Sequence, residues 1–257
     1  MHKSIQESEQ YSPLNIRRYE RIFGTDFVSS GGLETTGTIC YTLDIRPGTR
    51  VLDVGSGLGG SAFHMNRVHG AVVTGVDILP QMVAMATQRA AEYGLDGVKF
   101  IEGDILDMQL PAASFDLVYS RDAFLYIKDK LALFQTLYGL LAPQGRLFVS
   151  DYACGPGPLS DEFINYANGA GYYLEEPEVY GSWIKAAGFQ EVQAQDMTDT
   201  FIAVLQREVA DIRKGAGQPE DGLDQEDREY LAARWERKIR WCTDGDMKWG
   251  HLRAKRS

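Results

Sequence analysis

The feature that most constrains this chain is the stretch VLDVGSGLGG at 51–60, where an apolar run ends in an acidic residue and a glycine cluster. Gly55, Gly57 and Gly59 permit a tight strand-to-helix turn, and without a Cβ their backbone can lie against a ligand. About one strand and one helix later, the segment TGVDI places Asp77 where a carboxylate can accept hydrogen bonds from a ribose. The pattern predicts a nucleoside-cofactor site.

The order of the motif separates two classes of cofactor. Dinucleotide-binding folds use G-x-G-x-x-G, in which a helix N-terminus faces a pyrophosphate. Here the order is D-x-G-x-G-x-G from Asp53, and a carboxylate at that point repels pyrophosphate but suits a cationic ligand such as the amino acid end of S-adenosylmethionine. Asp104 and Ile105 end a third apolar segment, where they offer an adenine an acceptor and an apolar wall. The ordered set favours a class I methyltransferase over an NAD-dependent dehydrogenase or a generic doubly wound domain.

Alternating strand and helix patterns organise the chain into three regions. The predicted strands of the central region are RVLDVG, AVVTGVDI, VKFIEGDI, FDLVYS and GRLFVSDY, separated by helical segments. This alternation predicts a Rossmann-like, mostly parallel, doubly wound sheet with ligands beyond the strand carboxyl ends. Residues 32–152 form the predicted cofactor core, and residues 153–257 a helical, aromatic acceptor-binding insertion that also completes the sheet. Residues 1–31 are aromatic and turn-rich, and they form either a lid over the site or a helix that covers the sheet edge.

The later part of the chain contributes one more strand and a break. QEVQAQDM is a predicted strand, and a long helix is expected from about 198 to 214. The glycine- and proline-containing segment KGAGQPEDG that follows is expected to be an exposed loop.

Charge and cysteine usage limit the classes of partner. A formal net charge of −10 opposes contact with a phosphate backbone, so nucleic acid is not expected as the acceptor. The three cysteines are scattered without metal-ligand spacing, so we expect no metal and a reducing, cytoplasmic location. The polar start MHKSIQESEQ and the lack of a run of about 18 apolar residues predict neither export nor membrane insertion. The oligomeric state stays open, and a monomer is compatible with these features.

Motifs along nearly the whole chain carry a family resemblance. They are YERIFGTDFVSSGG at 19–32, VLDVGSGLGG, GVDI, GDIL, FDLVYSRDA, WERKIRW and KWGHLRAK. In this order they resemble the phosphoethanolamine methyltransferases, the single-domain enzymes of nematode and protozoan phosphocholine synthesis. The resemblance implies that the N-terminal segment is a lid and that S-adenosyl-L-methionine is the methyl donor, with S-adenosylhomocysteine as its product.

The same resemblance implies two sets of binding residues. Around the donor it implies Ser29, Ser30, Asp53, Gly55, Gly57, Asp77, Ile78, Asp104, Ile105, Arg121 and Asp122. Around a small anionic acceptor it implies Gln10, Tyr11, Tyr152, Tyr166, Tyr172 and a basic residue of WERKIRW, Lys238 or Arg240.

Two positions depart from the family pattern. Where the family has a histidine paired with the lid tyrosine, in D-A-x-L-H, this chain has Tyr126, so the expected catalytic pair is Tyr11 and Tyr126. A phenol with a pKa near 10 is a poorer general base at neutral pH than an imidazole near 6.5. Where the family has a phosphate-binding arginine, two residues before Tyr172, this chain has Ala170, which cannot offer a bidentate fork.

These departures widen the choice of acceptor. Methyl transfer from a sulfonium is an in-line displacement, so a base is needed only when the acceptor must lose a proton. A thioether or a tertiary amine has no such proton. Electron-rich rings at Tyr11 and Tyr126 would stabilise a cationic product by about 0.5–2 kcal/mol per good contact. The open alternatives are a phosphoethanolamine-type N-methyltransferase, an S-methyltransferase of a carboxylate-bearing thioether, a betaine-forming N-methyltransferase of glycine-type amines, and a noncatalytic S-adenosylmethionine-binding module.

Overall fold

The structure of this chain is a computed structural model that describes residues 9–214 and 223–257. The first eight residues of the predicted lid lie outside the described residues. Residues 215–222 of the predicted loop KGAGQPEDG also lie outside the described residues. The first residue of that segment, Lys214, is described, and it is the last residue of a helix.

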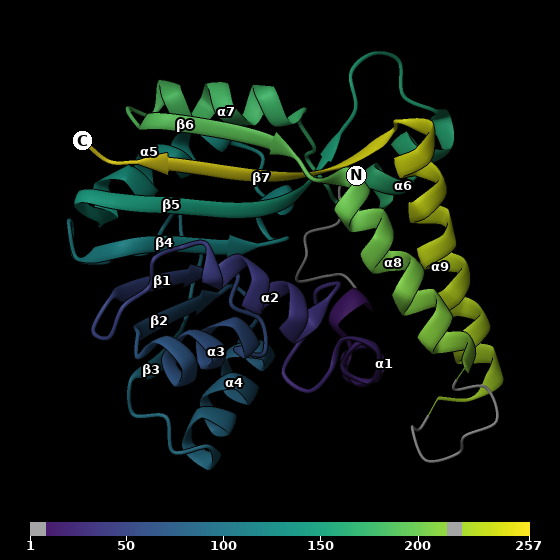
Figure 1. The fold of residues 1–257 in the computed structure, drawn as a ribbon, viewed down its shortest axis with the longest axis horizontal. Helices are drawn as coiled ribbons and strands as arrows, with labels where there is room; N and C mark the ends of the chain where they lie inside the picture. Colours follow the sequence, from purple (N-terminus) through teal and green to yellow (C-terminus); the bar gives the residue numbers. More distant parts are fainter. Residues whose placement is uncertain (1–8, 215–222) are drawn as a thin grey trace.

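A single seven-stranded sheet forms the centre of the molecule (Figure 1). Its strands are β1 (Arg50–Val54), β2 (Val72–Asp77), β3 (Val98–Glu102), β4 (Phe115–Arg121), β5 (Leu141–Cys154), β6 (Gln190–Asp196) and β7 (Met247–Lys255). They lie in the order β3-β2-β1-β4-β5-β7-β6, and β7 runs antiparallel to both of its neighbours. The first five strands are parallel, so the prediction of a mostly parallel, doubly wound sheet is confirmed.

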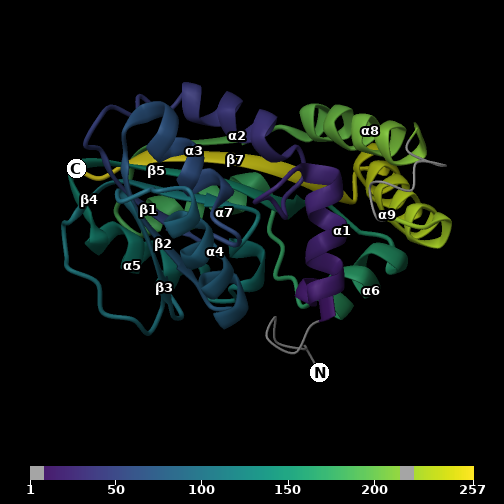
Figure 2. The ribbon, with the colours of Figure 1, turned by 90° about the horizontal axis from the view of Figure 1, so that it is seen from below.

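Helices cover both faces of this sheet (Figure 2). Those that cover the parallel strands are α2 (Gly32–Tyr41), α3 (Gly60–His69), α4 (Pro80–Glu92) and α5 (Lys130–Leu140), and α7 (Pro177–Ala186) packs beside α5 on β6 and β7. Successive strand residues point to opposite faces. Val51 of β1 therefore packs in a cluster with side chains of α2 and α3, whereas Leu52 packs in another with side chains of α5 and α7.

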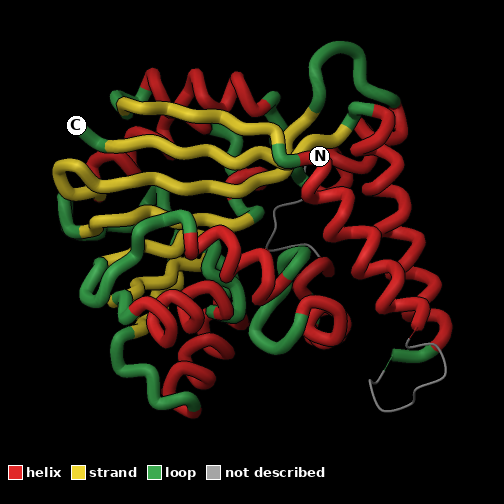
Figure 3. The backbone as a smooth tube through the Cα atoms, in the orientation of Figure 1, coloured by secondary structure: helices red, strands yellow, loops and turns green. Residues whose placement is uncertain are grey.

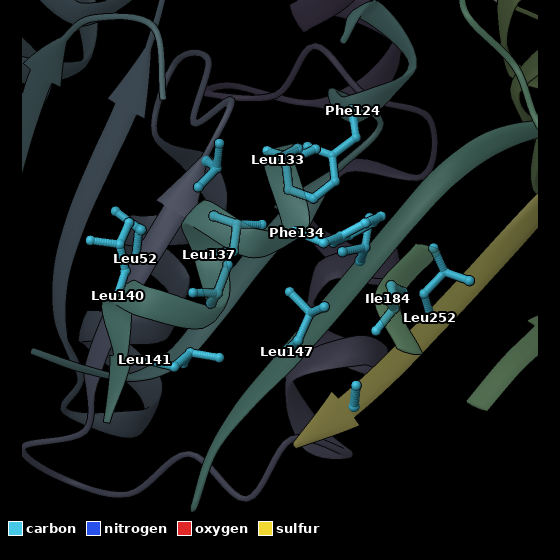
Figure 4. Close-up of a cluster of buried hydrophobic side chains, with 14 of the residues drawn as sticks. Leu52, Phe124, Leu133, Phe134, Leu137, Leu140, Leu141, Leu147, Ile184 and Leu252 are labelled. Atoms are coloured by element: carbon cyan, nitrogen blue, oxygen red, sulfur yellow. The ribbon is translucent and has the colours of Figure 1, made fainter. Parts of the chain in front are cut away.

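The cluster around Leu52 shows how the second face is filled (Figure 4). In α5, Leu137 lies four residues after Leu133 and three after Phe134, so the three side chains share one helix face. They are fully buried against the strands, together with Ile184 of α7. Burial of this size holds the sheet rigid, and a rigid sheet fixes the loops at its carboxyl end.

A second group of helices lies beyond the carboxyl ends of the parallel strands (Figures 1 and 3). It contains α1 (Pro13–Phe23), α6 (Asp161–Ala170), α8 (Thr198–Lys214) and α9 (Gln225–Asp244). Two short 3₁₀ turns, η2 (Glu9–Tyr11) and η3 (Phe124–Tyr126), share a pocket with α1 and α9. The group packs around an aromatic cluster that includes Phe23, Phe163, Phe201, Trp235 and Trp241. The long strands β5 and β7 extend into this cluster, so one sheet supports both halves.

Local sequence explains why the N-terminal segment forms a docked helix. Ser12 accepts a hydrogen bond from the backbone N–H of Asn15 at 3.4 Å, and Pro13 occupies the first helical position of α1. At its other end, Phe23 packs on Trp235 of α9 with ring centroids 5.7 Å apart, and Arg18 forms an ion pair with Asp227. The segment therefore packs against α9 as well as against the core.

Candidate cofactor and acceptor pockets

The turn that follows β1 contains Gly55, Gly57 and Gly59, and there is no room for a side chain at Gly55. The backbone N–H of Gly55 donates to the carbonyl of Val76 at 2.8 Å, which ties the turn to β2. Gly55 has a φ of +73°, and a Cβ there would lie 2.3 Å from the Cβ of Ala123. Only glycine fits both the left-handed backbone and this close approach.

Asp77 shapes the same turn from the end of β2. Its Oδ2 accepts from the backbone N–H of Gly57 at 2.8 Å, and its Oδ1 accepts from Leu79 at 2.9 Å. Burial raises the pKa of Asp77, and these backbone donors oppose that rise. Each carboxylate oxygen has a second lone pair, so Asp77 can still accept from a ligand hydroxyl.

A cavity of about 740 Å³, including its opening to solvent, lies over this turn. Its walls include Tyr11, Val28, Ser29, Gly55, Gly57, Asp77, Ile78, Met82, Gly103, Asp104, Ile105, Arg121, Asp122, Ala123 and Tyr126. The walls are mainly apolar with a few carboxylates, and the volume is in the range of about 300–1,000 Å³ typical of cofactor sites. The structure thus brings most of the predicted donor-binding residues to one cavity.

Asp53 is the exception among the predicted donor-binding carboxylates, because it does not line the cavity. It lies buried near the end of β1, two residues before Gly55, and its Oδ2 has no hydrogen-bond partner among the residues that the structure describes. Burial and the nearby charge of Asp77 raise the pKa of Asp53 to about 7, and Arg121 opposes the rise. An unpaired buried acceptor of this kind fits a nucleoside ligand that carries a cationic end.

Arg121 binds the N-terminal segment rather than a carboxylate. One guanidinium nitrogen donates to Thr36 Oγ1 at 2.6 Å and to the Gly32 carbonyl at 3.1 Å, and the other donates to the Ser30 carbonyl at 2.6 Å. These bonds hold Ser29 beside this cavity, whereas Ser30, also predicted to bind the donor, lines only the second pocket described below. Arg121 thus lines the predicted donor site, and it also holds the backbone around residues 30–36 in place.

A second pocket, of about 430 Å³, adjoins the first. Its walls include Gln10, Tyr11, Tyr19, Phe23, Ser29, Ser30, Asp122, Tyr126, Tyr152, Tyr172, Arg234, Trp235 and Lys238. Tyr11, Ser29, Asp122 and Tyr126 line both spaces, so two ligands would meet at this shared wall.

Tyrosines form a connected group in the second pocket. Tyr126 is hydrogen-bonded to Tyr11 and to Tyr172, and Gln10 also bonds to Tyr172. The ring of Tyr172 lies against those of Tyr126 and Tyr152, with centroids 5.2 and 6.3 Å away. Burial raises the pKa values of Tyr11 and Tyr126 above the ordinary phenol value. These hydroxyls stay protonated at neutral pH, so they can orient a ligand but cannot take its proton.

Tyr166 lies one layer behind these rings. It is not part of the pocket wall; the centre of its ring lies 4.5 Å from that of Trp241 in a tilted contact and 5.7 Å from that of Tyr172 in an edge-on contact. Its hydroxyl is buried, and its hydrogen bond to the Tyr172 hydroxyl contributes to the shifts in the pKa values of both phenols. Tyr166 therefore supports Tyr172 from behind.

Of the two basic residues of WERKIRW that were expected to bind the acceptor, one lies in the second pocket and the other lies on the surface. Lys238 is 7% exposed; its Nζ donates to Tyr152 Oη at 2.9 Å and lies 4.6 Å from the centre of that ring. Burial and the nearby charge of Arg234 lower the pKa of Lys238 to about 8. Arg240 is outside the pocket, where it is exposed and donates to both carboxylate oxygens of Glu162 at 2.6 and 2.7 Å. Of these two basic residues, Lys238 is therefore the one that lines the pocket.

Sequence reasoning missed Arg234 and Tyr19. Both line the second pocket, and Arg234 donates to Tyr19 Oη at 3.1 Å. The signal for Arg234 was present, because it precedes Lys238 by four residues and residues at this spacing share a helix face.

Asp122, at the end of β4, adopts a left-handed backbone with φ of 51°. Its Oδ1 accepts from Trp249 Nε1 at 2.9 Å, whereas its Oδ2 is buried without a partner among residues 9–214 and 223–257. Burial raises the pKa of this carboxyl, and Arg121 opposes the rise. A strained, partly unsatisfied carboxyl at the wall between two pockets is a functional-site candidate.

Within the described ranges, no group of three or more His, Cys, Asp or Glu side chains is arranged to hold a metal ion. No described helix has the length and apolar character needed to cross a membrane. Cys40, Cys154 and Cys242 are free thiols.

Comparison with known proteins gives three kinds of match. A family model described as a methyltransferase domain matches residues 45–201. Phosphoethanolamine N-methyltransferase 1 of Arabidopsis thaliana is 39% identical over 98% of this chain and 51% of its own length, and the Plasmodium falciparum phosphoethanolamine N-methyltransferase is 33% identical over 99% and 96%. The chain thus spans about half the length of the plant relatives it matches.

Among solved structures, Haemonchus contortus phosphoethanolamine N-methyltransferase 2, in complex with phosphomonomethylethanolamine and S-adenosylhomocysteine, superimposes with a TM-score of 0.92. It is 31% identical, and the match covers 96% of this chain and 58% of that one. The similarity therefore includes the core and the outer helices alike.

Proposed function

This chain belongs to the phosphoethanolamine N-methyltransferase family of methyltransferase domains, and from that premise we propose that it transfers a methyl group from S-adenosylmethionine to a phosphoethanolamine-type amine. The observation that carries the proposal is the wall shared by the two pockets. A donor in the larger cavity and an acceptor in the smaller pocket would meet at Tyr11, Asp122 and Tyr126. Such an arrangement suits direct transfer between two bound molecules.

The donor site would use the carboxylates at the strand ends. When bound, S-adenosylmethionine supplies an electrophilic methyl group on a sulfonium. Asp77 would accept from the ribose hydroxyls, Asp104 from the adenine amine, and Asp53 would neutralise the cationic amino acid end. Ile78 and Ile105 line the same cavity and would supply apolar contacts to the base.

The acceptor site would orient the amine and exclude water. Tyr152, Tyr172 and Lys238 offer hydroxyl and ammonium donors for a phosphate, and Tyr11 and Tyr126 border the end where the amine would lie. The electron-rich rings would stabilise a product ammonium by about 0.5–2 kcal/mol per good contact. Orientation and water exclusion are the main contributions that an in-line methyl transfer needs from protein side chains.

An amine attacks only as the free base, so a proton must leave an ammonium acceptor first. The buried phenols of Tyr11 and Tyr126 are unsuited to accept it, because burial raises their pKa values. Asp122 borders both pockets, and its Oδ2 is unpaired among the described residues. We propose that this oxygen binds the ammonium and receives the proton.

A second candidate acceptor is a thioether or a tertiary amine, which the phenol at position 126 favours. Neither needs a strong base at the reacting atom. A carboxylate on such an acceptor would be held by Lys238 in place of a phosphate.

The test is turnover by the purified protein. We would incubate it with S-adenosylmethionine and phosphoethanolamine, its mono- and dimethylated forms, glycine derivatives or carboxylated thioethers, and follow products by mass spectrometry. Methylation of the phosphobases is the expected result. Turnover of thioethers or glycine derivatives alone would contradict the phosphobase proposal and favour the second candidate. Donor binding without turnover of any acceptor would contradict both and favour a noncatalytic module.

A matched pair of variants separates the role of the phenol. Tyr126→His restores an imidazole, and Tyr126→Phe removes the hydroxyl without adding a base. If proton transfer to Asp122 limits the first methylation, the added imidazole of Tyr126→His raises the rate with phosphoethanolamine about tenfold or more, and Tyr126→Phe does not. Equal rates in both variants would show that the residue at 126 only fills space.

We further propose a cytoplasmic location and a small-molecule acceptor. The three free thiols support a reducing compartment, and the net charge of −10 supports an acceptor other than nucleic acid. Fractionation of cells that express the tagged protein would test the location.

A further inference from the structure

Helix α9 presents two cations to the acceptor pocket. Arg234 and Lys238 lie one helical turn apart, and both line the pocket wall. Trp235, which lies between them in the sequence, lines it as well and packs on Phe23 of α1. This face of α9 is thus the positively charged side of an otherwise aromatic pocket.

Neither cation forms an ion pair with a carboxylate in the described part of the chain. Arg234 donates to the phenol of Tyr19, and Lys238 donates to the phenol of Tyr152. Other arginines at the same end of the molecule have acidic partners, as in the pairs Arg18–Asp227 and Arg240–Glu162. Phenols neutralise no charge at neutral pH, so no hydrogen-bonded carboxylate among the described residues compensates the positive charge of this pair.

The nearest acidic side chains are used elsewhere. Glu208 of α8 accepts from the backbone of Gly31 and from Trp235 Nε1, both at 2.5 Å. One oxygen of Asp122 accepts from Trp249. Two like charges one turn apart repel each other, and Arg234 does lower the pKa of Lys238. The arrangement is relieved when an anion binds between the two cations.

We propose that Arg234 and Lys238 together bind the phosphate of the acceptor as a dianion. A guanidinium offers a planar fork that matches two phosphate oxygens, and the lysine adds a point charge for the third. A phosphate monoester carries a charge of about −1.5 to −2 at pH 7, which matches two cations better than a carboxylate does. Ala170, at the end of α6, offers no charge, so the guanidinium comes from α9. This inference rests on the proposed function and specifies its substrate class.

The experiment compares Arg234→Gln with the wild-type protein on phosphoethanolamine and its methylated forms. We expect KM to rise about tenfold or more, the loss that follows removal of one charge-assisted hydrogen bond, while kcat changes less. The affinity for S-adenosylmethionine, measured by calorimetry, stays unchanged because Arg234 does not line the donor cavity. Arg240→Gln is the matched control, since Arg240 lies on the same helix outside the pocket.

Two further variants separate charge from structure. Tyr19→Phe removes the hydrogen-bond partner of Arg234 but leaves the guanidinium charge in place, so the KM rises less than in Arg234→Gln. Arg234→Lys keeps the charge but loses the fork, so its KM lies between those of the wild type and Arg234→Gln. This variant also provides the test if Arg234→Gln does not fold.

The pH dependence gives a readout that a purely structural role would not change. The second phosphate pKa is about 6, so wild-type KM falls as the acceptor becomes dianionic from pH 5 to 7. In Arg234→Gln this fall is reduced.

The outcomes distinguish the inference from the proposed function. Phosphobase turnover with an unchanged KM and pH profile in Arg234→Gln overturns the inference alone. An equal rise in KM in Arg234→Gln and Tyr19→Phe also overturns the inference alone, because it would show that the Arg234–Tyr19 hydrogen bond matters for structure and not for phosphate binding. Absence of phosphobase turnover by the wild-type protein overturns the proposed function, and the inference falls with it.

Discussion

The donor cavity and the acceptor pocket differ in how many parts of the chain build them. Apart from a few residues near the N-terminus, the donor cavity is made by one continuous α/β stretch, residues 54–127. The acceptor pocket combines η2 and α1, the end of β4, the end of β5, the segment after α6, and α9. A site built by neighbouring loops is specified locally, whereas a site built by distant helices depends on how they pack.

The two spaces also differ in charge. Carboxylates, including Asp77 and Asp104, line the donor cavity, whereas Arg234 and Lys238 line the acceptor pocket. These charges would direct a cationic donor to the first space and the proposed anionic acceptor to the second. Substitutions should affect one ligand at a time, and the following predictions run from the largest expected effect to the smallest.

Gly55→Ala should damage only the donor side. The new Cβ would lie 2.3 Å from the Cβ of Ala123, and the residue would keep a left-handed φ. Overpacking and backbone strain each cost about 1–3 kcal/mol, so we expect roughly a hundredfold loss of S-adenosylmethionine affinity by calorimetry. Gly139→Ala in α5 is the control, because nothing lies within 4 Å of its added Cβ. A Gly55→Ala affinity within threefold of wild type would contradict this account of the turn.

Lys238→Gln should damage only the acceptor side. It removes a buried charge and the donor to Tyr152, so KM for a phosphobase should rise roughly 30-fold. The affinity for S-adenosylmethionine should not change, because Lys238 does not line the donor cavity. A parallel loss of both affinities would mean that the two pockets are not independent.

The pH profile of acceptor binding should show the titration of Lys238. Its pKa is lowered to about 8 by burial and by Arg234, so the ammonium is lost as pH rises through about 8. KM for a phosphobase should then rise by up to about tenfold between pH 7 and 9. The same measurement on Lys238→Gln is the control. If KM still rises with pH in this variant, the titrating group is not Lys238.

Arg240→Gln should have the smallest effect. An exposed ion pair such as Arg240–Glu162 contributes about 0–1 kcal/mol to stability, and neither partner lines a pocket. We expect kinetic constants within about twofold of wild type and a small change in Tm. A large rise in KM would contradict this prediction and would mean that Arg240 does bind the acceptor.

Much of the fold and of the donor site was predictable from local patterns. The strands of the parallel half follow the predicted apolar segments, because each segment has the length and flanking turns of a buried strand. Gly55, Gly57 and Asp77 were predictable because backbone conformation and spacing alone restrict such residues. The order of β7 between β5 and β6 has no local signal.

The acceptor pocket was less predictable for a physical reason. Arg234 and Tyr19 belong to helices whose sequences also fit ordinary packing, and only the approach of α1 to α9 brings their side chains together. The choice between Lys238 and Arg240 likewise depends on which face of α9 turns inward, which only the packed structure determines.

The place of β7 has a consequence for synthesis of the chain. β6 leaves the ribosome before β7, yet the sheet holds it only through β7, which lies between β6 and β5. Because chains begin to fold during synthesis, β6 must wait with an unpaired edge until α8 and α9 have formed an antiparallel hairpin and returned the chain to the sheet. Helix α9, which carries both cations of the acceptor pocket, therefore also leads directly into the last strand. Substitutions that loosen the α8–α9 hairpin should first appear as low yield of native protein, through aggregation of chains whose sheet has not closed.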